Sequence, residues 1–242
     1  MDVDPPQRAR GFTTRAVHSG ERPVRPEFTP TVTPIYPSVS YLADDPETLD
    51  AVFAGDQPGF VYTRHGNPTT RALEIAVAAL EETEDAVAFG SGMAALLAAL
   101  LNEVQAGDCI VASRDLYGAT QALLGNVLGT LGVRTTFVDI LDLEAVERTL
   151  AEIRPRALLF ETISNPLVRV ANIPALAAIA KRQTPRVRTI VDNTFATPLL
   201  VNPARFGIDT VVHSTTKYLA VMGTPPEASS PRRGIARSRS AS

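Results

Sequence analysis

The chain has 242 residues, of which 45% are hydrophobic and 20% charged, a composition typical of a globular protein. Its net charge of −3 gives no electrostatic reason to expect a nucleic acid or an anionic membrane as a partner. The single cysteine, Cys109, excludes an intramolecular disulfide framework and a cysteine-based metal cluster. No apolar run reaches the roughly 18 residues of a membrane span, and no secretory signal begins the sequence, so a cytoplasmic protein is expected.

Residues 1–60 are expected to form an extended N-terminal arm, because seven prolines fall within the first 40 residues and apolar periodicity is weak. From residue 69 onward, helical patterns alternate with short apolar strands. The predicted helices are Thr69–Glu82, Ala94–Val104, Ala119–Leu131, Leu143–Ile153 and Pro174–Arg182, and the predicted strands are Ala86–Phe89, Cys109–Ala112, Arg134–Val138, Ala157–Phe160, Val187–Val191 and Thr210–His213. This alternation predicts an α/β domain over residues 61–221, with a mainly parallel sheet flanked by helices.

The composition changes at Met222. Residues 222–242 contain four arginines, one glutamate and a single branched aliphatic residue. Such a segment cannot bury enough apolar surface to fold, so a disordered tail is expected. A tail that binds nucleic acid is the alternative, and the absence of aromatic residues and repeats disfavours it.

Lysine is scarce in this chain. Of the 23 basic residues, only Lys181 and Lys217 are lysines. An amine can lose its proton and act as a nucleophile, whereas a guanidinium stays protonated. Lys181 ends a predicted helix, where a cation is favourable for the helix dipole. Lys217 follows the last predicted strand of the sheet and is therefore the candidate nucleophile.

Several polar residues fall at the carboxyl ends of predicted strands, where ligands bind in an open parallel sheet. The turn Gly90–Met93 leads from a strand into a helix, as a phosphate-binding loop does, although a simple tight turn also explains it. Asp192 is suited to hold a cationic ring nitrogen or to cap a turn, and Tyr117 to stack on a planar ligand or to pack half-buried. Glu161 and Asn165 are ambiguous, because Asn-Pro is a common turn.

The same residues favour an organic cofactor over a metal ion. His65 and His213 lack the close spacing of a metal-binding pair, and Cys109 lies inside an apolar strand, so no metal site is expected. A phosphate loop, a carboxylate, an aromatic ring and a scarce lysine are together the four functions that pyridoxal phosphate needs from a protein.

Longer motifs carry a family resemblance. They include Tyr62-Thr-Arg-His-Gly-Asn-Pro-Thr69, Ser91-Gly-Met93, Asp115-Leu-Tyr-Gly118, Val191-Asp-Asn-Thr-Phe-Ala-Thr-Pro198 and His213-Ser-Thr-Thr-Lys-Tyr-Leu219. In this order and spacing, the chain resembles the Cys/Met-metabolism family of pyridoxal-phosphate enzymes, which contains cystathionine γ-synthase, cystathionine γ-lyase and O-acylhomoserine sulfhydrylase. The resemblance implies the large domain of the aspartate-aminotransferase-like (type I) fold. It also implies a transferase or lyase that acts by γ-replacement or γ-elimination on homoserine esters or cystathionine.

The resemblance gives each matching residue an expected role. Lys217 would form the Schiff base with pyridoxal 5'-phosphate, Asp192 would pair with the ring nitrogen, and Tyr117 would stack on the ring. Asn165 would lie near the 3-hydroxyl. The phosphate would be held by Gly92, Met93, Ser214 and Thr216, and by Tyr62 and Arg64 of a neighbouring subunit. A dimer-built site and a homotetramer are therefore expected, with a small amino acid as substrate and neither nucleic acid nor membrane as partner.

The likeness to the family ends after Leu219, where Ala220-Val-Met replaces a glycine pair and a histidine. The C-terminal small domain, with its arginine for the substrate carboxylate, is therefore expected to be absent. Ala119 stands where methionine γ-lyases carry a cysteine, which ranks that activity lower. The alternatives are an inactive truncated fragment that at most binds the cofactor, and an unrelated α/β module that binds phosphate.

Overall fold

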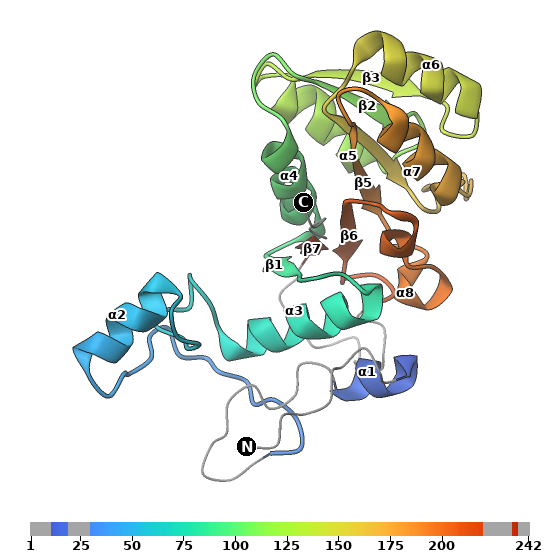
Figure 1. The fold of residues 1–242 in the computed structure, drawn as a ribbon. Helices are drawn as coiled ribbons and strands as arrows, with labels where there is room; N and C mark the ends of the chain where they lie inside the picture. The colour runs from blue at the N-terminus through green and yellow to red at the C-terminus, as the bar shows by residue number, and fades with distance from the viewer. Residues whose placement is uncertain (1–10, 19–29, 220–233, 237–242) are drawn as a thin grey trace. The chain divides into compact units, whose positions relative to one another are not determined.

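The structure is a computed structural model that describes residues 11–18, 30–219 and 234–236. The chain divides into two compact units, Met1–Ala79 and Leu80–Ser242, which Figure 1 shows in blue to cyan and in green to red. The first unit therefore extends past residue 60, where the arm was expected to end. In the described part of the chain, no helix has both the length and the apolar character that crossing a membrane requires.

Two helices interrupt the arm that we expected to be extended. They are α1 (Phe12–His18) and α2 (Pro46–Ala54). Helix α2 has clear start and stop signals: the Asp45 carboxylate accepts a hydrogen bond from the Thr48 amide at 2.6 Å, and Pro46 occupies the first helical position. Gly55 then ends the helix in the left-handed region, at φ 82°. The prolines of the arm thus mark helix boundaries as well as extended segments.

Asn67 caps the start of helix α3 (Pro68–Glu81), and its side chain also contacts the arm. The Asn67 carbonyl oxygen accepts a hydrogen bond from the Thr69 amide at 2.9 Å. Its amide group donates to the Tyr36 carbonyl and to the Tyr41 hydroxyl, both at 2.9 Å. These bonds join the arm to the start of α3, and they explain why the first unit reaches to Ala79.

The second unit contains a seven-stranded sheet in the order β1-β7-β6-β5-β4-β2-β3. Its strands are β1 (Val87–Phe89), β2 (Cys109–Ser113), β3 (Arg134–Val138), β4 (Ala157–Glu161), β5 (Arg188–Asp192), β6 (Thr210–Ser214) and β7 (Gly234–Ala236). Its longer helices are α4 (Gly92–Glu103), α6 (Leu143–Ile153) and α7 (Ile173–Arg182), and its shorter helical segments are α5 (Gly118–Ala122) with the wider turn Leu123–Leu128, α8 (Thr197–Leu200) and Pro203–Phe206. Strands β2 to β6 are all parallel, which confirms the predicted mainly parallel sheet.

Apolar residues on alternate strand positions form two cores, one on each face of the sheet. In β4, Leu159 joins the core under α4 and α5, while Leu158 and Phe160 join the core under α6 and α7. Figure 1 shows helices on both faces. Burial on both faces is the reason why these strands are continuously apolar in sequence.

Strand β7 lies inside the segment for which composition predicts disorder. Gly234–Ala236 pairs antiparallel with both β1 and β6. Its backbone groups therefore provide hydrogen-bond partners for the facing edges of these two strands. For these three residues, the structure differs from the expected disordered tail. The rest of that tail, residues 222–233 and 237–242, lies outside the described residues.

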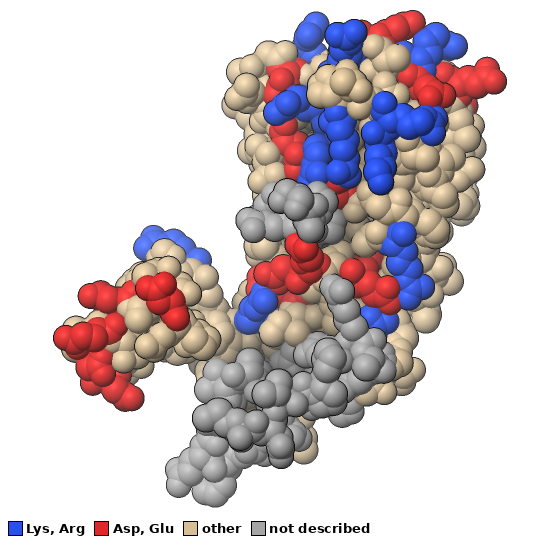
Figure 2. All heavy atoms as spheres, viewed as in Figure 1, with Lys and Arg blue, Asp and Glu red and all other residues tan. Residues whose placement is uncertain are grey.

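Charged side chains of both signs are intermixed on the visible face of the second unit in Figure 2.

The buried Asp209 carboxylate accepts several hydrogen bonds at the amino ends of β5 and β6. It accepts from the Thr189 amide and hydroxyl, both at 2.9 Å, and from Arg186 and Arg188, both at 2.7 Å. This carboxylate joins the starts of β5 and β6.

We expect Asp209→Ala to lower the free energy of unfolding by about 2–4 kcal/mol, because it leaves the buried Thr189 donors without their acceptor. A matched control is Glu147→Ala, which removes an exposed carboxylate paired with Arg182 and should cost less than about 1 kcal/mol. Urea unfolding followed by circular dichroism compares the two variants. Equal losses would contradict the assignment of Asp209 as the acceptor that joins these strands.

Candidate active site

Strand alternation brings polar residues to one face of the sheet at its carboxyl end. Glu161 and Asp192 are paired neighbours at the ends of β4 and β5, and Ser214 ends β6. Each lies two positions beyond a residue of the core under α4: Leu159, Ile190 and Val212. The period of two therefore places all three polar residues on the side of the sheet that α4 and α5 cover.

A cavity of about 230 Å³ lies at this end of the sheet. Eight of the ten residues expected to form the site line it: Gly92, Met93, Tyr117, Asn165, Asp192, Ser214, Thr216 and Lys217. The structure also adds lining residues that the sequence did not assign to the site: Ser91, Leu96, Glu161, Ile163, Thr194, Phe195 and Val212. Tyr62 and Arg64 belong to the first unit, where the Arg64 guanidinium lies 5.2 Å from the centre of the Tyr62 ring, and their role across subunits stays a prediction.

The start of α4 approaches Ser214 closely at Gly92. A Cβ atom at Gly92 would lie 2.9 Å from the Ser214 Cβ and 3.2 Å from its hydroxyl oxygen. Ser91 caps the helix by accepting a hydrogen bond from the Ala94 amide at 3.1 Å. The amides of Gly92 and Met93 precede the first bond within the helix, so they are donors without an intrahelical acceptor. Together with the hydroxyls of Ser214 and Thr216, they form a cradle whose donor chemistry fits a phosphate.

Asp192 is a carboxylate in a poorly solvated place. Desolvation raises its pKa, while hydrogen bonds from Thr194 and the nearby His213 oppose that rise. The Thr194 amide donates to Asp192 at 3.0 Å, and the Thr194 hydroxyl accepts from the Ser214 amide at 2.8 Å. A cationic group in the cavity would stabilise the ionised form of Asp192, which is the interaction that a protonated ring nitrogen offers.

A buried hydrogen-bond network stands behind the cavity. Glu81 accepts from the Asn193 amide group at 2.8 Å and contacts the His213 ring nitrogen Nε2 at 2.5 Å. Asn193 also accepts from the Thr162 hydroxyl at 2.8 Å. Three of these four residues are next to a lining residue in sequence: Thr162 follows Glu161, Asn193 follows Asp192 and His213 precedes Ser214. The network therefore connects the ends of β4, β5 and β6 on the side of the sheet away from the cavity. The sequence did not predict this network, because Glu81 lies far from the other three residues in the chain.

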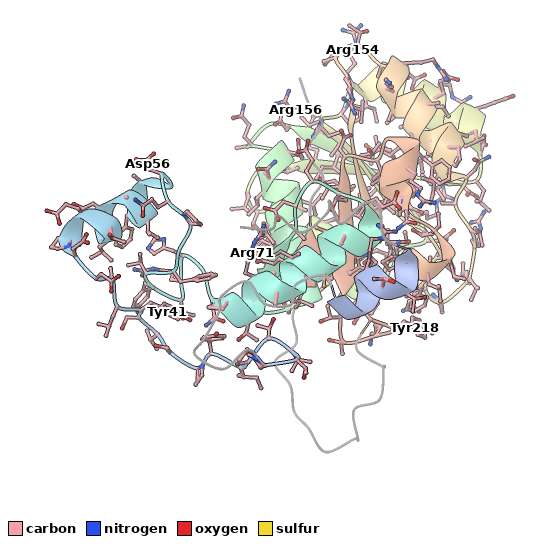
Figure 3. The ribbon with its side chains drawn as sticks, turned by 60° about the horizontal axis from the view of Figure 1, so that its bottom comes forward. Tyr41, Asp56, Arg71, Arg154, Arg156 and Tyr218 are labelled. Carbon is pink, nitrogen blue, oxygen red and sulfur yellow. The ribbon has the colours of Figure 1, made fainter. Side chains whose placement is uncertain are left out.

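Lys217 lies in the turn after β6, and its backbone amide donates to the Ser214 carbonyl at 3.1 Å. The next residue, Tyr218, packs its ring edge-on against Phe195, with the ring centroids 5.8 Å apart. Figure 3 labels Tyr218 at one end of the second unit and Arg156, which precedes β4, at the other. Lys181, the other lysine, lies in the last turn of α7 as expected and does not line the cavity.

The sequence is similar to those of known enzymes. Residues 13–224 match the family model described as Cys/Met metabolism PLP-dependent enzyme. L-methionine gamma-lyase of Fusobacterium nucleatum is 41% identical over 209 residues, which are 86% of this chain and 52% of that protein. Cystathionine gamma-synthase of Mycobacterium bovis is 41% identical over 213 residues, which are 88% of this chain and 52% of that protein.

Solved structures share the fold. A Campylobacter jejuni protein described as an O-acetylhomoserine (thiol)-lyase is 31% identical, with a TM-score of 0.84 over 95% of this chain and 54% of that one. Its structure contains N'-pyridoxyl-lysine-5'-monophosphate. The likeness confirms the type I pyridoxal-phosphate fold. The chain spans about half the length of the curated relatives it matches.

Proposed function

This chain belongs to the Cys/Met metabolism family of pyridoxal-phosphate-dependent enzymes, and we propose that its cavity binds pyridoxal 5'-phosphate through Lys217 for γ-replacement or γ-elimination on homoserine esters or cystathionine. One observation carries the proposal. The scarce lysine, a desolvated carboxylate, an aromatic ring and a helix N-terminus line one cavity.

The cradle and Asp192 fit the cofactor at its two charged ends. The amides of Gly92 and Met93 and the hydroxyls of Ser214 and Thr216 would hold the phosphate. Asp192 would keep a proton on the ring nitrogen, Tyr117 would pack on the ring, and Asn165 would lie near its hydroxyl. When bound, the cofactor supplies a cationic ring that withdraws electrons from the reacting carbon of the substrate. The Lys217 amine would then hold and move the proton of that carbon.

Relatives of different activity support the proposed reaction class. A protein named for elimination and one named for replacement are each 41% identical to this chain, so we propose the class rather than one of its members. A small amino acid is the substrate. A homotetramer in the cytoplasm is also proposed.

A second function has support from the lining of the cavity. Among the described residues that line it, Lys217 has the only cationic side chain. The described lining therefore supplies no bidentate guanidinium partner for a substrate carboxylate. The second candidate is a chain that binds the cofactor but turns over substrate slowly.

Titration of the full chain with pyridoxal 5'-phosphate tests both functions. Visible absorbance that survives gel filtration would support cofactor binding. Turnover of cystathionine or an O-acylhomoserine at about 1 per second or faster would support the enzyme over the second candidate. A chain that binds inorganic phosphate but gives no visible band would contradict both and support the phosphate-binding module.

The phosphate cradle predicts a difference between two neighbouring glycines. Gly92→Ala should weaken binding of pyridoxal 5'-phosphate about tenfold or more, because its Cβ would push α4 away from Ser214. Gly90→Ala is the matched control, since a Cβ there meets nothing within 4 Å. The dissociation constants of the two variants are compared by absorbance titration. Equal affinities would contradict a cradle formed by α4 and Ser214.

A further inference from the structure

Glu161 connects the two loops that carry Tyr117 and Asn165. It is the last residue of β4 and is 7% exposed. One of its carboxylate oxygens accepts a hydrogen bond from the Tyr117 amide at 2.6 Å, and the other accepts from the Asn165 amide at 3.0 Å. One carboxylate therefore binds the backbone amides of both residues: Tyr117, which is expected to stack on the ring, and Asn165, which is expected to lie near its hydroxyl.

We propose that Glu161 is a positioning residue that sets Tyr117 relative to Asn165, and so shapes the slot, the part of the cavity beside these two residues in which the cofactor ring would lie. The proposal rests on the proposed function. It assigns Glu161 no contact with the reacting atoms. Its action runs through two backbone amides, and it requires the ionised carboxylate, because only that form presents two equivalent acceptor oxygens.

The two loops have a second connection, which is more exposed to water. Arg169, in the loop after β4, contacts Asp115, two residues before Tyr117, and donates to Asp139 at 2.9 Å. The pair that joins the two loops is Arg169 with Asp115, whose side chains are 32% and 15% exposed, so water reaches this pair more easily than it reaches Glu161. The Tyr117 carbonyl accepts from the Thr120 and Gln121 amides within α5, whereas the Tyr117 amide donates to Glu161. Glu161 is therefore the buried link between the Tyr117 backbone and the loop after β4.

The Glu161 carboxyl group gains and loses its proton near neutral pH. Desolvation raises its pKa to about 7 and the charge of Asp192 adds to the rise, while the bonds from the Tyr117 and Asn165 amides oppose it. Among the described residues, the other titratable or charged groups near it are the Tyr117 phenol and the Lys217 amine, which line the same cavity, and the Asp115–Arg169 pair that joins the two loops. As the pH falls through about 7, Glu161 gains a proton and one of its two acceptor positions is lost. Tyr117 and Asn165 should therefore be held most firmly above that pH.

Glu161→Gln tests the proposal because a glutamine has one acceptor oxygen in place of two. At pH 8.5 we expect the variant to bind pyridoxal 5'-phosphate about tenfold more weakly than the unmodified chain, as for loss of a charge-assisted hydrogen bond. At pH 6 the ratio of the two affinities should approach one, because the unmodified chain has then lost its own bridge. Glu147→Gln, on the exposed face of α6, is the control and should leave the affinity unchanged at both pH values.

Amide hydrogen exchange of the cofactor-free chain gives a readout that does not depend on cofactor binding. The Tyr117 and Asn165 amides should be protected at pH 8.5, and at least one should exchange faster in Glu161→Gln. If Glu161→Gln fails to fold, Glu161→Asp replaces it: the shorter side chain should protect only one of the two amides.

The outcomes separate this proposal from the proposed function. A chain that protects both amides but does not bind pyridoxal 5'-phosphate would contradict the proposed function, and with it the slot. A chain that binds the cofactor with an affinity ratio independent of pH, or with no loss in Glu161→Gln, would overturn only the positioning role.

Discussion

Lys217→Arg is expected to abolish covalent attachment of pyridoxal 5'-phosphate and the visible absorbance that accompanies it. The guanidinium remains protonated at any pH at which the protein is folded, so it cannot supply the free amine that the attachment needs. Among the described residues that line the cavity, no other side chain is cationic, so no neighbouring amine can replace that of Lys217. Absorbance after gel filtration measures the loss, which should be complete.

Lys181→Arg is the matched control, because Lys181 and Lys217 are the only lysines of the chain. It changes an exposed residue in the last turn of α7, where arginine serves the helix end equally well. Its absorbance should equal that of the unmodified chain. A visible band retained in Lys217→Arg and lost in Lys181→Arg would reverse the assignment.

Asp192→Asn is expected to keep part of the cofactor affinity and to lose most of the chemistry. A neutral amide cannot hold a proton on the ring nitrogen by charge, so the ring withdraws electrons less strongly. Removal of one such electrostatic partner typically costs about 10²–10³ in rate. Exchange of the α-proton of an amino acid in deuterated water, followed by NMR, measures the effect without requiring a particular substrate.

The control for this variant is Asp142→Asn at the start of α6. The Asp142 side chain accepts from the Ala145 amide at 2.9 Å, and asparagine caps a helix as well as aspartate does. Its exchange rate should stay within about twofold of that of the unmodified chain, as expected for a neutral cap substitution. An unchanged exchange rate in Asp192→Asn would show that this carboxylate does not act on the cofactor ring.

Much of the second unit could be predicted because its local signals agree with its packing. The predicted helix Leu143–Ile153 and strand Arg134–Val138 have the bounds of α6 and β3. The continuously apolar strands predicted a sheet buried on both faces. Period-two alternation, counted forward from Leu159 and Ile190, would also have placed Glu161 and Asp192 side by side.

The rest could not be predicted, for physical reasons that differ from place to place. Helix α2 has no buried residue, so apolar periodicity could not find it, although Asp45 and Gly55 mark its two ends. Strand β7 gains its order from pairing with β1 and β6, and its composition gives no sign of this. Glu161 stays ambiguous in the sequence, because its contact is an amide 44 residues earlier in the chain.

The attachment of the cofactor to Lys217 can be measured by borohydride reduction of the full chain saturated with pyridoxal 5'-phosphate, followed by peptide mass mapping. We expect a pyridoxyl group on the peptide that contains Lys217 and none on the peptide that contains Lys181. Label on Lys181 alone, or on neither lysine, would contradict this attachment.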